Sequence, residues 1–165
     1  MSIDSASLTI GAKSDKIYSR SDIGRYVMTV IVCIDTGRGM TFFGKRQSTD
    51  SVLRERILAL AGGGLVASPY TASQFTKNDS VTVSDVAPAD GVWFAEEVDP
   101  APFAERIDTL VIYRWNRAYP REMKLTLDPY DAGMRLCSIA DFKGSSHERI
   151  TEEIWTRRGG TEGTL

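Results

Sequence analysis

The sequence predicts an α/β fold in which a mixed β-sheet carries flanking helices and ends in an antiparallel hairpin. First, residues 28–34 form an unbroken apolar, β-branched run, which is typical of a strand covered on both faces. Second, apolar residues between 52 and 60 recur at helical spacing. Third, β-rich runs alternate with turns after residue 120, which is typical of antiparallel strands. Strands that alternate with helices earlier in the chain imply right-handed crossovers, so the sheet should be mixed.

Further elements are expected in order along the chain. Residues 35–46 are interpreted as a Gly-rich loop, and Ser48 as the N-cap of a helix that ends at Gly62-Gly63-Gly64. Short strands are expected at 65–68, 81–83 and 92–95, a turn or short helix at 71–75, and a short helix at 100–106. Later strands are expected at 109–115, 123–127, 135–139 and 148–156.

A chain of 165 residues with 42% apolar and 25% charged residues suits one globular domain. We expect that domain in residues 28–158, between a disordered N-terminal tail (1–27) and a flexible C-terminal tail (159–165), with Met28 as a candidate translation start. The net charge of −2 argues against a nucleic-acid partner. No run approaches the roughly 20 apolar residues of a membrane span, and no secretory signal is recognised, so the cytoplasm is the expected location.

Metal and disulfide chemistry are not expected. Cys33 and Cys137 both lie in apolar, strand-like runs, which predicts two buried thiols. His147 is the single histidine, too few for a zinc site, and the HxHxDH cluster of metallo-β-lactamase hydrolases is absent.

From residue 28 to 158, the order of elements resembles that of dihydrofolate reductase. Members of that family open with an apolar strand, a Gly-containing loop and a helix, as expected here from 28–34, 35–46 and the helix near Ser48. The segment 107–115 is similar to the family strand after the second nucleotide-binding crossover, and 135–142 with 147–158 is similar to the closing hairpin. The resemblance implies a three-layer fold around a mixed sheet.

The resemblance also gives Asp50 a candidate catalytic role. In the family, a buried carboxylate on the first helix helps to protonate the pterin ring, and Asp50 is the matching residue. It follows a polar stretch, 46–49, where the family has an apolar-proline-x-acid pattern. Burial in an apolar cleft would raise the pKa of Asp50 and make it an acid near neutral pH. The alternative is that Asp50 stabilises the helix from its first turn.

Two family segments that bind NADPH at helix starts are not matched. The Gly-Arg-Lys/His-Thr pattern is replaced by the segment 67–71, which lacks a basic residue and contains Pro69, a residue without a backbone donor. The Gly-Gly pair is replaced by Glu96 and Glu97, which would repel a pyrophosphate. We therefore expect no cofactor. The acidic pair is interpreted as a solvated loop rather than a metal site completed by Asp99, because adjacent side chains in extended chain diverge.

Three other segments carry candidate functional residues. The segment 37–40 is interpreted as an ordinary turn, since it lacks the Gly-Lys-Ser/Thr ending of a phosphate-binding loop. The segment 144–148 is interpreted as a polar hairpin turn rather than a serine nucleophile with its base. The segment 114–120 combines arginines with aromatic residues, as binding sites do, so Trp115 and Tyr119 are candidate ligand-binding residues.

Three hypotheses follow, and the sequence leaves open whether the protein is an enzyme. The first is a diverged member of the fold that binds a small molecule or a protein partner in the former substrate cleft, near Arg46, Asp50, Trp115 and Tyr119. The second is an NADPH-dependent reductase of a pterin-like or other heterocyclic substrate, with Asp50 as the proton donor. The third is a homodimer assembled through exposed strands. The acidic pair Glu96-Glu97 favours the first.

Overall fold

The computed structural model describes residues 27–157, so the predicted tails lie outside the described residues, apart from Val27. Its first elements are β1 (Met28–Ile34), β2 (Gly39–Phe42), β3 (Lys45–Arg46), α1 (Ser51–Ala61), β4 (Leu65–Ala67), α2 (Pro69–Ala72), β5 (Val81–Val83) and β6 (Gly91–Phe94). They are followed by the 3₁₀ helix η3 (Ala101–Arg106), β7 (Ile107–Arg114), β8 (Met123–Lys124), β9 (Met134–Phe142) and β10 (Ile150–Arg157).

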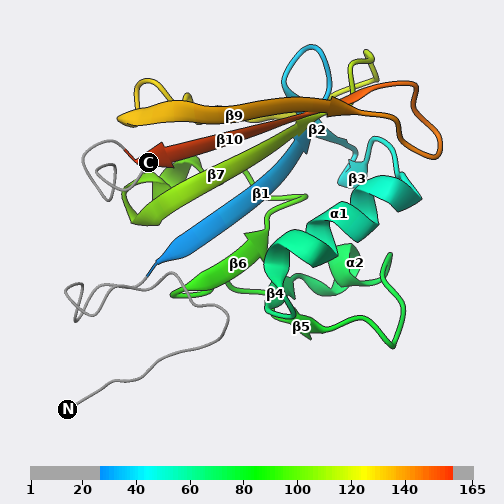
Figure 1. Ribbon diagram of the computed structural model, residues 1–165, viewed down its shortest axis with the longest axis horizontal. Helices are drawn as coiled ribbons and strands as arrows, with labels where there is room; N and C mark the ends of the chain where they lie inside the picture. The colour runs from blue at the N-terminus through cyan, green and yellow to red at the C-terminus, as the bar shows by residue number, and fades with distance from the viewer. Residues whose placement is uncertain (1–26, 158–165) are drawn as a thin grey trace.

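Seven strands form one sheet in the order β5-β4-β6-β1-β7-β10-β9 (Figure 1). β1 lies near the centre and pairs in parallel with β6 and β7. β10 pairs antiparallel with β7 and β9, so the chain closes in an antiparallel hairpin. This arrangement confirms the predicted α/β fold with a mixed sheet. A small second sheet, β3-β2-β8, stands beside the carboxyl end of β1.

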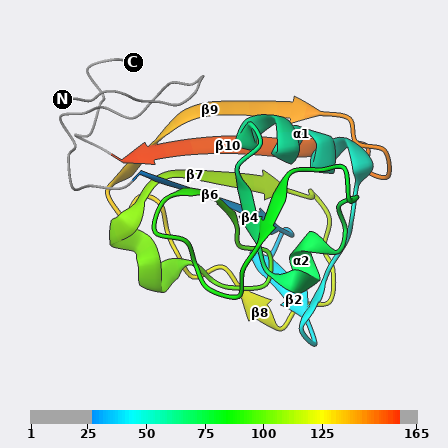
Figure 2. The same cartoon turned by 90° about the horizontal axis from the view of Figure 1, so that it is seen from below.

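Alternating side chains of β1 supply a core on each face of the main sheet. Ile31 and Cys33 pack on the face covered by α1, which contributes Leu53 and Ile57. Figure 2 shows α1 on one side of β1 and η3 with β8 on the other. The opposite core contains Met28, Val30, Val32 and Ile34, together with Leu125 and Leu127 from the segment after β8. Because both faces are covered, β1 reads as a continuous apolar run.

The prediction of a Gly-rich loop at 35–46 is wrong in part, because residues 39–46 form the β2–β3 hairpin. Its two-residue turn places Phe43 at φ 52° and Gly44 at φ 73°. These values match the left-handed turns that suit tight hairpins, in which glycine or asparagine is preferred. A phenylalanine at such a position is therefore unusual, which explains why the turn gave no clear signal in the sequence.

Two further predictions need correction. The helix α1 is capped by Asp50 rather than Ser48, because the Asp50 carboxylate accepts the N–H groups of Val52 and Leu53. Cys33 is buried as predicted, whereas Cys137 is exposed. Cys137 lies in β9, the edge strand of the sheet, next to Thr156 of β10.

Candidate functional site

Asp50 joins the start of α1 to the turn between β9 and β10. Besides capping the helix, its carboxylate accepts the backbone N–H groups of Ser145 at 3.0 Å and Ser146 at 2.8 Å. A Cβ atom at Gly144 would collide with Asp50 Oδ2, so this turn needs a glycine to approach the carboxylate. One buried side chain thereby fixes two segments that are nearly a hundred residues apart in sequence.

The prediction that burial makes Asp50 an acid near neutral pH is wrong. Burial alone would raise the pKa of Asp50, but hydrogen bonds from the backbone of Ser146, Ser145 and Leu53 and from the His147 ring outweigh it. They hold the pKa of Asp50 well below its usual range, because hydrogen bonds to the charged form favour that form. Asp50 is therefore an ionised acceptor of hydrogen bonds. Its local structure agrees with the alternative interpretation, in which Asp50 stabilises the start of the helix.

His147 lies at the centre of the polar cluster around Asp50. Its side chain is buried and stacks on Trp115, with ring centroids 4.6 Å apart. Nδ1 lies 3.0 Å from Ser146 Oγ and 3.2 Å from Asp50 Oδ2. Nε2 lies 2.9 Å from the Tyr119 hydroxyl and 3.2 Å from Ser48 Oγ. Because an ionised carboxylate only accepts hydrogen bonds, the contact with Asp50 places a proton on Nδ1, and Nε2 faces the two hydroxyl groups.

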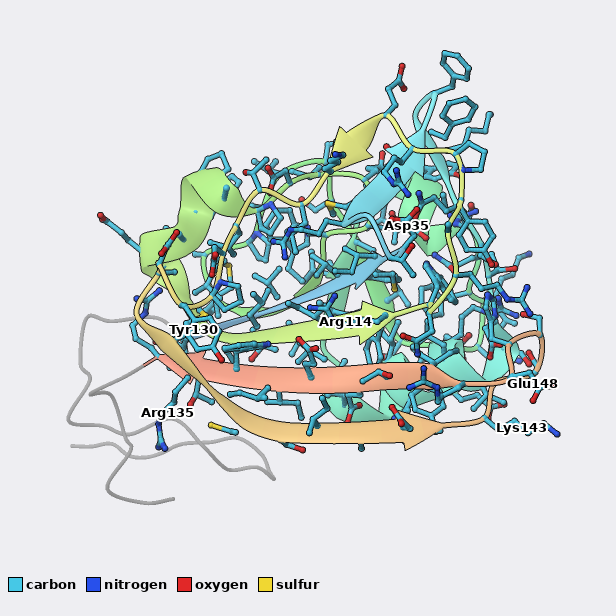
Figure 3. All side chains as sticks on the ribbon, turned by 90° about the horizontal axis from the view of Figure 1, so that it is seen from above. Asp35, Arg114, Tyr130, Arg135, Lys143 and Glu148 are labelled. Atoms are coloured by element: carbon cyan, nitrogen blue, oxygen red, sulfur yellow. The ribbon has the colours of Figure 1, made fainter. Side chains whose placement is uncertain are left out.

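The structure thus brings three of the four predicted site residues, Asp50, Trp115 and Tyr119, together around a histidine that sequence analysis assigned to a polar turn. Lys143 and Glu148, from the same turn, are exposed, as expected (Figure 3). His147 alone turns inward. A single polar residue among exposed neighbours carries no periodic signal, so only the fold could show that it is buried.

The guanidinium of Arg46, the fourth predicted site residue, is bonded to Glu96 and to Tyr70. It forms a two-pronged ion pair with Glu96, with Nε 2.8 Å from Oε2 and the terminal nitrogen 3.1 Å from Oε1. The same group donates to the Tyr70 carbonyl oxygen and lies 4.2 Å from the centre of the Tyr70 ring. Such bidentate pairs are strong and directional.

The interpretation of Glu96 and Glu97 as a solvated acidic loop is wrong. Glu96 is only 6% exposed, and the Thr71 hydroxyl lies between the two carboxylates, 2.9 Å from Glu96 Oε1 and 2.8 Å from Glu97 Oε1. Glu97 also accepts from Ser68 Oγ at 2.7 Å, and Ser68 is the N-cap of α2. The two side chains converge because they follow the end of β6 instead of lying in a strand. The two segments that the resemblance assigned to cofactor binding are therefore bonded to each other.

Two hollows flank this region, and they differ greatly in size. The inner one lies between α1 and the sheet and has a volume of about 10 Å³, room for a single water molecule. It is lined by residues that include Cys33, Ser48, Asp50, Leu53, Phe94 and Trp115. The outer one has a volume of about 340 Å³, within the range of small-molecule sites. It is lined by Phe42, Phe43, Lys45, Arg46, Gln47, Tyr119 and Pro120.

Two walls form this outer pocket, the β2–β3 hairpin and the segment 119–120, and Asp35 holds them together. Asp35 follows β1 and accepts the N–H groups of Gly37, Gly39 and Tyr119 (Figure 3). Although burial alone would raise the pKa of Asp35, these hydrogen bonds and one from Arg121 lower it. The ionised Asp35 carboxylate thus holds both walls of the pocket in place in the absence of a ligand.

Three of the seven residues that line the outer pocket are aromatic, Phe42, Phe43 and Tyr119. The ring of Phe43 is 72% exposed, and its centroid lies 4.3 Å from that of Phe42. Gln47 donates through Nε2 to Asp35 and to the Pro120 carbonyl oxygen, which fixes the orientation of its amide. Its oxygen Oε1 is buried without a hydrogen-bond partner among the described residues.

Within residues 27–157, no group of three or more histidine, cysteine, aspartate or glutamate side chains is placed to hold a metal ion. In the same part of the chain, no helix has the length and apolar character needed to cross a membrane.

Comparison with solved structures identifies the fold. The chain is similar to the dihydrofolate reductase of Enterococcus faecalis in complex with NADP(H) and the compound RAB-propyl, with a TM-score of 0.57. The match covers 79% of this chain and 96% of that one, at 9% sequence identity. No protein-family model matches the sequence, and no curated protein matches it. The similarity therefore lies in the fold alone, as the order of elements predicted.

Proposed function

We propose that this dihydrofolate-reductase-like fold serves as a small-molecule-binding protein that does not use NADPH, and that its ligand binds in the outer pocket. The observation that carries the proposal is the contrast in volume, about 10 Å³ in the inner cleft against about 340 Å³ in the outer pocket. A pterin-sized molecule needs a site of several hundred cubic ångströms. The ligand site would thus lie at the mouth of the former substrate cleft, next to Arg46 and Tyr119.

The position of the Glu97 carboxylate argues against the binding of NADPH. This carboxylate accepts hydrogen bonds from Ser68 and Thr71 at the start of α2, so an internal anion already lies where the fold would receive a phosphate. Two unit charges 4 Å apart repel by about 4 kcal/mol at an effective dielectric constant of 20. That penalty is about half of the free energy of micromolar binding.

The alternative function, a reductase with Asp50 as the proton donor, has less support. The Asp50 carboxylate accepts hydrogen bonds from four backbone N–H groups, and its pKa is held well below the usual range. Such a group is a poor acid at neutral pH, because general acids work best with a pKa near the operating pH.

The lining of the outer pocket favours a planar aromatic ligand. Phe42 and Phe43 offer ring faces, and aromatic groups prefer offset or tilted stacking with ring centroids 4.5–7 Å apart. Lys45 is exposed at the rim and adds a positive charge. We therefore propose that the ligand is an aromatic anion.

A thermal-shift titration with NADPH, NADH, folates and flavins tests the cofactor part of the proposal. A ligand present at 100 times its dissociation constant adds about 2.7 kcal/mol to the stability, which raises the melting temperature measurably. We expect no shift with NADPH or NADH. A clear NADPH shift that Asp50→Asn leaves in place would contradict the proposal and favour the reductase.

The dye 8-anilinonaphthalene-1-sulfonate tests the pocket itself, because it is an aromatic anion. We expect fluorescence enhancement with the folded protein, and at least about a fivefold loss of affinity in Phe43→Ala, equivalent to roughly 1 kcal/mol of lost aromatic contact. Val86→Ala is the matched control, since Val86 is 71% exposed and is not among the residues that line the pocket. Equal binding by the two variants would place the dye elsewhere and reject this pocket.

A further inference from the structure

His147 has a hydroxyl group on one side and a carboxylate on the other. Ser48 Oγ lies 3.2 Å from Nε2, and Asp50 Oδ2 lies 3.2 Å from Nδ1. This is the order nucleophile, base and orienting carboxylate, which is recognised by geometry rather than by sequence position. We propose that Ser48, His147 and Asp50 form a nucleophilic serine site that cleaves esters of small acyl groups.

The local chain geometry supports these roles. Ser48 and Asp50 come from one short segment before α1, whereas His147 comes from the β9–β10 turn. Asp50 is immobilised by four backbone N–H groups, so its contact with Nδ1 holds the ring in the tautomer with a free Nε2 lone pair. Trp115 stacks on the ring and restricts its tilt. Ser48 is only partly buried, so solvent can reach the proposed nucleophile.

Tyr119 competes with Ser48 for the same lone pair. Its hydroxyl lies 2.9 Å from Nε2, against 3.2 Å for Ser48 Oγ. A neutral imidazole accepts one strong hydrogen bond at Nε2, so Tyr119 restrains the base in the resting protein. Removal of this hydroxyl should therefore raise the reactivity of Ser48, which a purely structural histidine would not explain.

The inner cleft limits the size of the acyl group. Ser48, Asp50 and Trp115 line this space of about 10 Å³, which admits a group the size of water or a methyl. An acetyl ester suits that volume, with its alcohol part directed to solvent. Longer acyl chains would have to displace the buried side chains of α1.

The reaction has two balanced steps. The Ser48 hydroxyl gives its proton to His147 Nε2 while Oγ bonds to the ester carbonyl carbon, and the alcohol leaves with that proton. Water then gives a proton to Nε2 and its oxygen to the acyl carbon, which releases the carboxylic acid and restores the Ser48 hydroxyl. Neither step needs an oxidant or a reductant.

The test combines hydrolysis of p-nitrophenyl acetate with labelling by a fluorophosphonate, followed by mass spectrometry to find the labelled residue. We expect the label on Ser48 and at least about a hundredfold slower hydrolysis in Ser48→Ala and His147→Gln, since general-base catalysis contributes 10² or more. Tyr119→Phe should label several times faster than the wild type. Ser138→Ala, an exposed serine on β9, is the control and should label like the wild type.

Circular dichroism of each variant shows that a loss of reactivity is not a loss of folding. A label on Ser145 or Ser146, or no label on either the wild type or Tyr119→Phe, overturns the proposal. So does acetate-ester hydrolysis that Ser48→Ala leaves unchanged. None of these outcomes depends on ligand binding in the outer pocket, so this inference and the proposed function can fail separately.

Discussion

The inner cleft and the outer pocket share one segment, residues 42–53, but differ greatly in volume, about 10 Å³ against about 340 Å³. Ser48 and Asp50 line the cleft, where Asp50 is bonded to His147 and Glu96 is bonded to Arg46. Phe43 and Gln47 line the pocket, where the Phe43 side chain is largely exposed. The polar groups around the cleft are thus bonded to one another, whereas the pocket offers an exposed aromatic side chain that a ligand could contact.

The largest effect is expected from Glu96→Ala. It leaves the Arg46 guanidinium without its partner, and Arg46 is only 18% exposed. Loss of one member of a buried ion pair costs about 3 to 5 kcal/mol, because the other charge stays buried and uncompensated. Urea denaturation measures this change in the free energy of unfolding.

The matched control for Glu96→Ala is Arg149→Ala, which removes an ion pair whose side chains are 58% and 50% exposed. Exposed pairs contribute roughly 0 to 1 kcal/mol. Similar losses in the two variants would show that the Arg46–Glu96 pair does not close the cleft.

Asp50→Asn should cost about 2 to 3 kcal/mol at neutral pH, from a weakened helix cap and unsatisfied backbone donors. The pKa of Asp50 is lowered in the folded state, so its stabilising contribution is present above the unfolded pKa of about 3.9 and is lost as pH falls toward the folded pKa. Urea denaturation between pH 7 and 2 should give a weaker pH dependence below pH 4 in Asp50→Asn than in the wild type. Asp85→Asn, at an exposed position, should keep the wild-type dependence.

Phe43→Asn should change stability and binding in opposite directions. Asparagine tolerates the φ of 52° better than phenylalanine, so the free energy of unfolding should rise by about 1 kcal/mol. Binding of 8-anilinonaphthalene-1-sulfonate should fall, because the exposed ring is lost. Thermal unfolding and a dye titration on the same sample measure both. A variant that is less stable than the wild type contradicts strain at Phe43, and equal binding of the dye contradicts a role of its ring in the pocket.

The last prediction is a difference in rate between two thiols and leaves the stability of the protein unchanged. Cys33 lines the inner cleft and is 6% exposed, and its burial, with the nearby Glu96 carboxylate, raises the pKa of its thiol. Cys137 is exposed on β9. Reaction with 5,5′-dithiobis(2-nitrobenzoate) should be at least about a hundredfold slower at Cys33, since a buried thiol reacts only after local opening. The variant Cys137→Ser leaves Cys33 as the thiol whose rate is measured. Comparable rates for Cys33 and Cys137 would mean that the cleft opens readily.

The order of elements and the fold class could be read from the sequence because hydrophobic periodicity is a local property. The apolar run of β1 is long enough to indicate a strand buried on both faces, and its alternating side chains do fill two cores. The end of α1 at Gly62 was equally readable, because this residue takes the left-handed conformation that favours glycine. The β2–β3 hairpin was missed because its turn uses phenylalanine where asparagine or glycine is usual.

The candidate site was only partly predictable. Asp50, Trp115 and Tyr119 were chosen for their residue types and positions, and they do meet. His147 was passed over, because the groups that bury it lie far away in sequence and its own neighbours are exposed.

The sequence by itself determined most of the strands and helices, because apolar spacing and glycine positions act within one turn or one strand. Only the tertiary structure decided that Asp50 is an ionised acceptor, that Arg46 and Glu96 form an ion pair, and that the inner cleft is small. The physical reason is that the charge state and accessibility of a buried polar group depend on its partners in space. Those partners are 50 to 97 residues away in the chain.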